Sequence, residues 1–259
     1  MRALVLAEGG SGFPPGADDF VLPPIFGSVT KPMVLVVLSV IIIATYFLLA
    51  TRNLKIVPSK SQFVAETIYD FGRNNIAREQ IGTKDFRPFV PLIFSLFTFV
   101  LVNNLFGIIP ILQFPTMSRI GFPIALFIMV YLTIHAVGFK RHGFVGYFKH
   151  VMFPPNVPKA IYILLAPIEF VQRFVFQPLF LAVRVFAAMF AGHLLLLVFT
   201  LGGTALLEAS TGFLKPASVV SWAIAIAMTF LEALIEVLQA YIFALLSANF
   251  IGAALAQEH

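Results

Sequence analysis

Cysteine is absent from the 259-residue sequence, and charged residues make up only 11% of it. Without cysteine the chain has no disulfide, no thiolate metal site and no cysteine nucleophile. An average soluble domain is about 25% charged. The low charge content of this chain therefore argues against a soluble globular protein. The sequence also lacks internal repeats, low-complexity tracts and any polar stretch long enough for a separate soluble domain.

Hydrophobic residues make up 59% of the chain and gather in five apolar stretches, which predicts an all-α polytopic membrane protein. A helix needs ~20 residues to cross the ~30 Å hydrocarbon core. Each of the first three stretches has about that length, whereas the last two would be ~60 Å long as helices. We therefore expect two long oblique helices that form a hairpin, joined by residues 202–216. The stretches are about 32–50, 88–112, 122–139, 161–201 and 217–256.

Two basic loops set the expected orientation. Eleven Lys and Arg residues lie in 51–87 and 140–160, against four on the other side. Because cytoplasmic loops carry this excess, we expect the N-terminus outside and the C-terminus inside, which needs an odd number of spans. A break at Pro178 would give six spans, so we favour one helix through this proline. The expected organisation is one membrane domain, 1–259, with an extracytoplasmic segment, 1–30, and a long hairpin, 161–256.

The first basic loop also contains an apolar and charged pattern with helical spacing, which predicts an amphipathic helix from about 60 to 79. Such a helix either lies at the membrane surface or is a solvated connector, and the sequence leaves both alternatives open. The residues that carry the pattern are Phe63, Ile68, Phe71 and Ile76 with Glu66, Asp70, Arg73 and Arg78.

Arg184 is the only residue with a permanent charge in the apolar run 178–199. A guanidinium group keeps its proton on burial, and its placement at the bilayer centre costs at least ~2.5–3.5 kcal/mol. Arg184 must therefore face protein, water or a carboxylate. Its helical face otherwise consists of small residues, which allows a close approach by another helix. These residues are Ala187, Ala188, Ala191 and Gly192.

Further polar residues lie within the last two apolar stretches. Glu232, Glu236 and Gln239 share one helical face, and His193 faces away from Arg184. A carboxylate in hydrocarbon must be protonated, paired or hydrated. If the hairpin brings its two helices together, His193 and Glu232 are the natural pair to meet. Because an unperturbed histidine titrates near neutral pH, this pair would form a proton relay.

Two other polar pairs have structural or functional interpretations. Glu169 and Arg173 are four residues apart and are expected to form an intrahelical ion pair. Asn103 and Asn104 are expected to bridge helices by hydrogen bonds. The sequence shows neither metal-ligand spacing, nor a phosphate-binding glycine loop, nor a nucleophile with its base. We therefore expect no metal, no cofactor and no covalent catalysis by this chain.

Three motifs resemble those of subunit a of F-type ATP synthase, in the order and spacing of that family over at least residues 85–259. Arg184-Val-Phe-Ala-Ala-Met-Phe-Ala-Gly-His193 resembles its hallmark motif. Leu238-Gln239-Ala240-Tyr241-Ile242-Phe243 resembles a second signature, and Asn103-Asn104-Leu-Phe-Gly-Ile-Ile-Pro110 resembles an early one. The sequence departs from the family at Ala188, where many relatives carry asparagine, and at Gln177, where a basic residue is common.

The resemblance implies a non-catalytic, proton-translocating subunit in a bacterial plasma membrane. Its implied partners are the rotating ring of c subunits, the stalk subunit b, the whole F1Fo complex and the lipid bilayer, with no nucleic acid. Arg184 matches the essential arginine that faces the ring, and His193 with Glu232 matches the outer half-channel. Gln239 matches a glutamine packed near the arginine, and Glu169 an acid near the inner half-channel. Glu236 is an added acid with a hypothetical auxiliary role.

Two other functions remain open on the sequence alone. The first is a self-contained proton-coupled secondary transporter, a class that often shows internal repeats, and none is found here. The second is a structural membrane scaffold, in which neutralising Arg184 would affect assembly alone. We favour protons over sodium as the transported ion.

Overall fold

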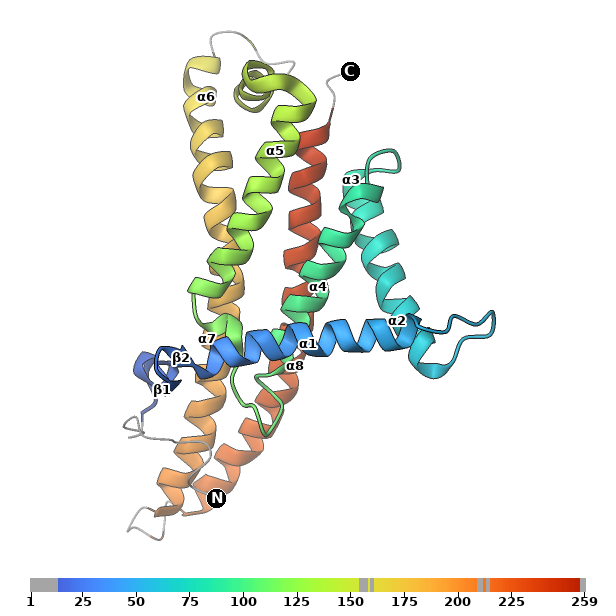
Figure 1. The fold of residues 1–259 in the computed structure, drawn as a ribbon. Coiled ribbons are helices and arrows are strands. Elements are labelled where there is room, and N and C mark those ends of the chain that lie inside the picture. Colours follow the sequence, from blue (N-terminus) through green and yellow to red (C-terminus); the bar gives the residue numbers. More distant parts are fainter. Residues whose placement is uncertain (1–13, 154–157, 159–160, 209–211, 213–214, 257–259) are drawn as a thin grey trace. The chain divides into compact units, whose positions relative to one another are not determined.

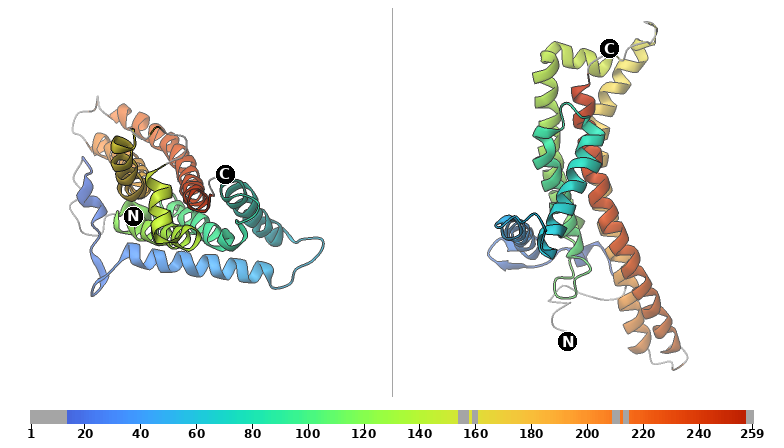
Figure 2. Two further views of the ribbon diagram at one scale, coloured as in Figure 1. Left: turned by 90° about the horizontal axis from the view of Figure 1, so that it is seen from above. Right: turned by 90° about the vertical axis from the view of Figure 1, so that its right-hand side faces the viewer.

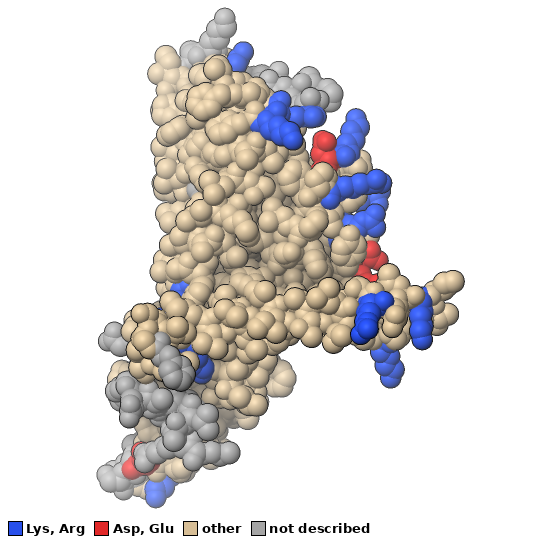
Figure 3. All heavy atoms as spheres, viewed as in Figure 1, with Lys and Arg blue, Asp and Glu red and all other residues tan. Residues whose placement is uncertain are grey.

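The computed structural model describes residues 14–153, 158, 161–208, 212 and 215–256, and these residues are almost entirely helical (Figure 1). Within this part of the chain five helices are long and apolar enough to cross a membrane, as the sequence predicts. Most of the surface drawn in Figure 3 is uncharged, and most of the Lys and Arg side chains seen there gather toward its right-hand edge. The chain is thus a multi-pass membrane protein. The five helices are Lys31–Thr51, Arg87–Leu105, Gly121–Lys149, Leu179–Glu208 and Lys215–Leu255.

The chain forms two compact units, which are described separately. Each unit combines segments that lie far apart in the sequence. The first unit contains Met1–Tyr46, Thr98–Arg119 and Val185–Ala240. The second unit contains Phe47–Phe97, Ile120–Arg184 and Tyr241–His259.

In the first unit the described N-terminal segment has more structure than the sequence predicts. A 3-10 helix, η1 (Ala17–Phe20), precedes an antiparallel pair of short strands, β1 (Pro24–Phe26) and β2 (Val29–Thr30). Gly27 has a φ of +52° in the turn between the strands, a conformation that glycine adopts without steric cost. Helix α1 (Lys31–Thr51) follows directly. Residues 1–13 of the predicted segment 1–30 lie outside the described residues.

The predicted long hairpin is formed by α7 (Gln177–Glu208) and α8 (Lys215–Leu255). In the first unit their parts Val185–Glu208 and Lys215–Ala240 lie side by side (Figure 2). Ser221 Oγ donates a hydrogen bond to the Phe199 carbonyl at 2.7 Å. The prediction that the connection begins at Gly202-Gly203 is wrong, because both glycines lie inside α7. A Cβ atom on Gly203 would collide with the Trp222 indole, so this glycine serves close packing instead.

The core of the first unit is a cluster of mainly aromatic side chains around the end of α4 (Val90–Leu105). The short 3-10 helix η3 (Arg87–Phe89) precedes α4. The expected span 88–112 is too long, since the helix stops at Leu105. Gly107 and Pro110 favour the turns that follow, and η4 (Thr116–Ser118) ends this irregular stretch. The buried residues of the cluster are Phe20, Leu35, Phe106 and Phe114.

The buried side-chain amide of Asn103 connects α4 to two other segments of this unit, as the sequence predicts. Its Nδ2 donates to Ser39 Oγ of α1 at 2.8 Å, and its Oδ1 accepts from Thr116 Oγ1 at 2.7 Å. The neighbouring Asn104 donates from Nδ2 to the Glu236 carbonyl of α8 at 3.2 Å. The predicted bridging role of both asparagines is therefore confirmed.

In the second unit the predicted amphipathic helix is present. It runs without a break through α2 (Lys60–Asp70), the π-helical η2 (Phe71–Arg78) and α3 (Glu79–Ile81). Gly82 ends it with a φ of +94°. Its C-terminal end packs against α8, where Asn249 Nδ2 donates to Gln80 Oε1 at 3.2 Å. Its location at the membrane surface stays a prediction.

Helix α5 (Gly121–Met152) consists of two helical parts that meet at a kink at Gly143, and the first part corresponds to the expected span 122–139. The polar residues after 139 favour a loop by composition, yet the residues that follow Gly143 form the second helical part. Gly143, with a φ of +72°, kinks the chain inside this element. The Tyr147 ring then packs against Gly138, where a Cβ atom would collide with it.

The chain passes Pro178 without a break, as we expected. Helix α6 (Tyr162–Val171) continues through the π-helical η5 (Gln172–Phe176) into α7. A proline cannot donate to the carbonyl four residues earlier and its ring crowds that carbonyl. The π-helical turn η5 ends two residues before Pro178, and π-bulges are a usual way for a helix to accommodate an interrupted hydrogen-bond ladder.

Candidate functional site

His193 and Glu232 meet across the hairpin of the first unit. His193 Nδ1 lies 3.3 Å from Glu232 Oε1, and the two residues are only 6% and 5% exposed. Gly192 of α7 lies next to this pair, since a Cβ atom there would be in ordinary van der Waals contact with Glu232 Cγ at 3.8 Å. The geometry therefore provides the contact that the sequence predicts for this pair.

Glu236 lies one helical turn beyond Glu232 and is fully buried. Its side chain contacts Gly107, the residue that begins the turn after α4. A Cβ atom on Gly107 would lie only 2.7 Å from Glu236 Oε1 and 3.2 Å from the Asn104 carbonyl oxygen. The absence of a side chain at 107 thus makes room for the carboxylate. The sequence gives no reason to connect these two positions.

Several polar atoms on this face of α8 and at the end of α4 have no hydrogen-bond partner among the described residues. They are buried atoms of four residues in the first unit, and buried polar atoms of this kind normally bind protein groups or ordered water. Carboxylates in such surroundings must be neutral or hydrated. The atoms are Asn104 Oδ1, Glu232 Oε2, both carboxylate oxygens of Glu236 and Gln239 Nε2.

A cavity of about 380 Å3 reaches His193 in the first unit. Residues of α7 and α8, including Thr200 and Thr229, form one part of its lining. The N-terminal segment, from Asp19 to Pro23, forms another part. This segment has no helical or strand-like periodicity, so no pattern in the sequence indicates that it approaches the histidine.

Arg184 lies on an exposed strip of α7. Phe180 is 58% exposed and Leu195 42% exposed, and Ala187 and Ala191 between them are also exposed. The opposite face, with Leu181, Val185 and Met189, is buried. Among the residues that the structure describes, no carboxylate forms an ion pair with Arg184. Gly192, predicted to extend the strip, instead lies next to Glu232.

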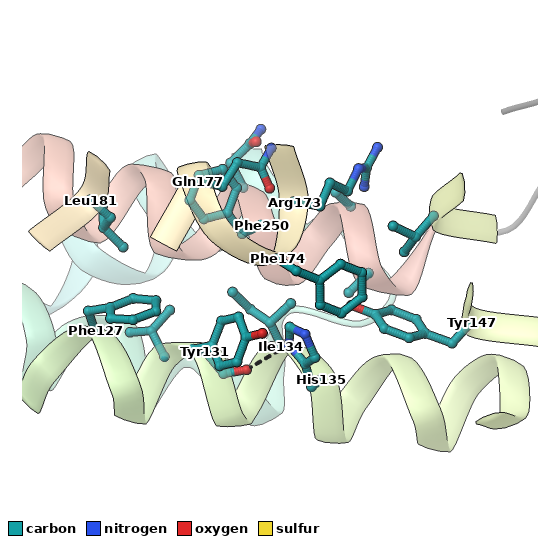
Figure 4. Close-up of a pocket in the computed structure, with 15 residues that line it drawn as sticks. Phe127, Tyr131, Ile134, His135, Tyr147, Arg173, Phe174, Gln177, Leu181 and Phe250 are labelled. Carbon is teal, nitrogen blue, oxygen red and sulfur yellow. Dashed lines mark hydrogen bonds between the residues drawn. The ribbon is translucent and has the colours of Figure 1, made fainter. Parts of the chain in front are cut away.

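Glu169 and Arg173 form the predicted ion pair in the second unit, with 3.5 Å between Glu169 Oε2 and Arg173 Nε. Arg173 also lines a cavity of about 190 Å3. Figure 4 shows Tyr131 and His135 of α5 facing Arg173 and Gln177 across this cavity.

The structure brings the predicted site residues together in two places. One is a group in the first unit, and the other is the Glu169–Arg173 pair in the second unit. The first-unit group is His193, Glu232, Glu236 and Gln239 with Asn103 and Asn104.

Known proteins resemble this chain over nearly its whole length. The ATP synthase subunit a of Nocardioides sp. (strain ATCC BAA-499 / JS614) is 43% identical over 267 residues, which cover 98% of this chain and 96% of that protein. The ATP synthase subunit a of Pseudarthrobacter chlorophenolicus is 45% identical over 258 residues, with 98% and 97% covered. That of Streptomyces lividans is 42% identical over 257 residues, with 96% and 90% covered.

The family described as ATP synthase A chain matches residues 33–252, a range that contains every predicted site residue from Asn103 to Gln239. The bacterial relatives and the five apolar helices agree with a bacterial membrane location. On these matches, this chain belongs to the ATP synthase A chain family.

Proposed function

We propose that the chain is the proton-translocating membrane subunit of an F-type ATP synthase and couples proton flow to ATP synthesis. It works without catalytic residues of its own, since the chemistry of ATP lies on other subunits. Its partners are a ring of c subunits, the stalk subunit b and the complete F1Fo complex. Its N-terminus lies outside and its C-terminus in the cytoplasm, in agreement with the basic residues of 51–87 and 140–160.

The buried contact between His193 and Glu232 is the observation that carries this proposal. The pair has zero net charge both as a neutral hydrogen bond and as an ion pair. A proton can therefore change sides within the pair without a change in the charge that the apolar surroundings must accommodate. A buried pair of a base and an acid with this property suits a proton relay.

Protons enter from the outside through the cavity that reaches His193 and pass to Glu232. The unpartnered atoms of Glu232, Glu236 and Gln239 follow on the same face of α8, and water bound to them continues the path. Glu236 acts here as an auxiliary proton carrier. Its full burial and its contact with the turn at Gly107 fix its position.

Arg184 faces the carboxylates of the ring from the exposed strip of α7. The small side chains of Ala187 and Ala191 allow a ring helix to approach this strip closely. A ring carboxylate that passes the permanent positive charge of Arg184 is favoured in its ionised form and releases its proton. The same charge repels protons and separates the outer half-channel from the inner one.

Released protons leave on the inner side, and Glu169 is the candidate acid of that half-channel. Its partner Arg173 lines the cavity of the second unit, together with Tyr131, His135 and Gln177. Protons are the transported ion in this proposal, because the polar groups along the path include a histidine and three carboxyl groups that exchange protons directly.

ATP-driven acidification of inverted membrane vesicles tests this function. We expect Arg184→Ala to abolish acidification in a complex that still assembles and hydrolyses ATP. Arg52→Ala is the matched control, since this exposed arginine lies outside the proposed path. Normal acidification with Arg184→Ala would refute the proposal. Loss of assembly, with normal pumping by the remaining complexes, would indicate a structural arginine.

A further inference from the structure

We propose that the N-terminal segment Ala17–Pro23 walls the outer end of the proton path and that Phe20 narrows its access to His193. The inference rests on the proposed function, because the proton path is part of it. It assigns a role in this path to residues that precede the first membrane-spanning helix.

Phe20 is the side chain that anchors this segment, and it is only 4% exposed. Its ring lies edge-on to the His193 imidazole, with 5.9 Å between the ring centroids and 72° between the planes. It also contacts the Phe190 ring at 4.6 Å and the Phe114 ring at 6.3 Å. Phe20 thus joins the N-terminal segment, the turn after α4 and helix α7 at the position of the histidine.

The segment is held in place by its own local structure as well as by this ring. Asp19 Oδ2 accepts a hydrogen bond from the Gly16 backbone N–H at 2.7 Å, which stabilises η1. Leu22 also packs against the aromatic core cluster that contains Phe20. The strand pair β1–β2 then returns the chain to the start of α1. Contacts before and after Phe20 in the sequence therefore hold the segment in place.

The cavity behind this wall is large enough for an aqueous path. Its volume of about 380 Å3 accommodates on the order of ten water molecules. Among the described residues that line it, Asp19, Lys31 and His193 have ionisable side chains. Asp19 and Lys31 belong to the N-terminal part of the chain and His193 to α7. Protons therefore meet charged groups at the wall before they reach the histidine.

Phe20 influences the path in two ways. Its ring occupies space next to the imidazole and keeps the opening narrow, so loss of the ring widens the access from the cavity. The edge-on contact also restricts the orientation of the imidazole, and Phe20 is in this sense a positioning residue for His193.

The absence of cysteine allows a direct test in the assembled complex. Thr229→Cys places a thiol in the lining of the cavity, one turn before Glu232. A charged, membrane-impermeant thiol reagent is added to right-side-out vesicles, and its reaction with this chain is followed by mass spectrometry. Phe20→Ala should raise the labelling rate about tenfold, because the ring no longer restricts access. Ile25→Ala, at an exposed residue outside the cavity, is the matched control and should change the rate less than about twofold.

A second reporter separates a local opening from general loosening of the protein. Ser247→Cys places a similar side chain at a fully buried position of α8. In the Phe20→Ala background its labelling should stay as slow as in the parent chain. If Phe20→Ala prevents assembly, Phe20→Leu replaces it and should give a smaller increase at Thr229→Cys.

Three results would overturn the inference: equal labelling of Thr229→Cys with and without Phe20, equal acceleration at Ser247→Cys, or labelling from the inner side alone. The labelling rate requires no proton flux. The proposed function fails instead if Arg184→Ala pumps normally, so the two failures are distinguishable.

Discussion

Replacing Gly107 by alanine places a methyl group against the buried carboxylate of Glu236. The Cβ atom would lie 2.7 Å from Glu236 Oε1, and an ordinary contact requires at least 3.4 Å. The carboxylate must therefore move by about 0.7 Å within a fully buried site. Two further contacts, to the Asn104 carbonyl oxygen and to Pro115 Cβ, are tight at 3.2 Å each.

Such overpacking costs ~1–3 kcal/mol. The backbone of Gly107 has no positive φ, so alanine also restricts the unfolded chain and offsets ~0.4–1 kcal/mol of this cost. We expect a net loss of about 0–2.6 kcal/mol in the free energy of unfolding, with a middle value of about 1.3 kcal/mol. In a Glu236→Ala background, Gly107→Ala should cost about 1 kcal/mol less, because the Glu236 Oε1 atom that the new methyl group would contact is absent.

The assay is the thermal unfolding of this chain in the purified complex. It compares the parent, Gly107→Ala, Glu236→Ala and the double variant. A loss of 1 kcal/mol should lower the Tm by ~2–4 °C for a chain of this size. Gly121→Ala is the control, since a Cβ atom there meets nothing within 4 Å. Strictly additive effects of Gly107→Ala and Glu236→Ala would refute the contact and with it the position assigned to the carboxylate.

Two other substitutions test the first unit. Asn103→Leu leaves the Thr116 hydroxyl without its acceptor and removes the donor to Ser39 Oγ, whose own hydrogen bond to the Val36 carbonyl remains. It should cost ~1–3 kcal/mol for each group left unsatisfied, visible as a lower Tm and less chain in the membrane, whereas Asn75→Leu at an exposed position should be neutral. Glu232→Gln preserves the shape of the side chain but cannot carry a proton, so ATP-driven acidification should fall on the order of 100-fold. Unchanged acidification in an assembled complex would show that Glu232 lies outside the path.

Hydropathy and helical spacing predicted the elements that depend on composition. Helix α8 begins and ends within two residues of the expected stretch 217–256, and α1 differs from 32–50 by one residue at each end. The pairing of His193 with Glu232 was also predictable. Few arrangements satisfy isolated polar groups in an apolar hairpin, so their partners follow from the groups themselves.

The errors concern glycine and local backbone geometry. Gly203 resembles the start of a turn in the sequence, yet it accommodates the Trp222 ring inside α7. At Gly143 the backbone leaves the helical conformation, and the polar residues that follow form a second helical part instead of the expected loop. Whether a glycine provides a turn or a packing site depends on which side chain approaches it, and that information comes from distant parts of the chain. The approach of Phe20 to His193 was unpredictable for the same reason.

The short distance between His193 and Glu232 has an electrical consequence. Moving one charge across the whole membrane is worth ~2.3 kcal/mol per 100 mV. The 3.3 Å between Nδ1 and Oε1 is at most about a tenth of the ~30 Å hydrocarbon core. A voltage of 100 mV therefore biases this transfer by no more than ~0.25 kcal/mol, which is less than the thermal energy. The exchange between these two groups would be nearly insensitive to voltage, and the voltage dependence of proton flow would arise in the longer parts of the path.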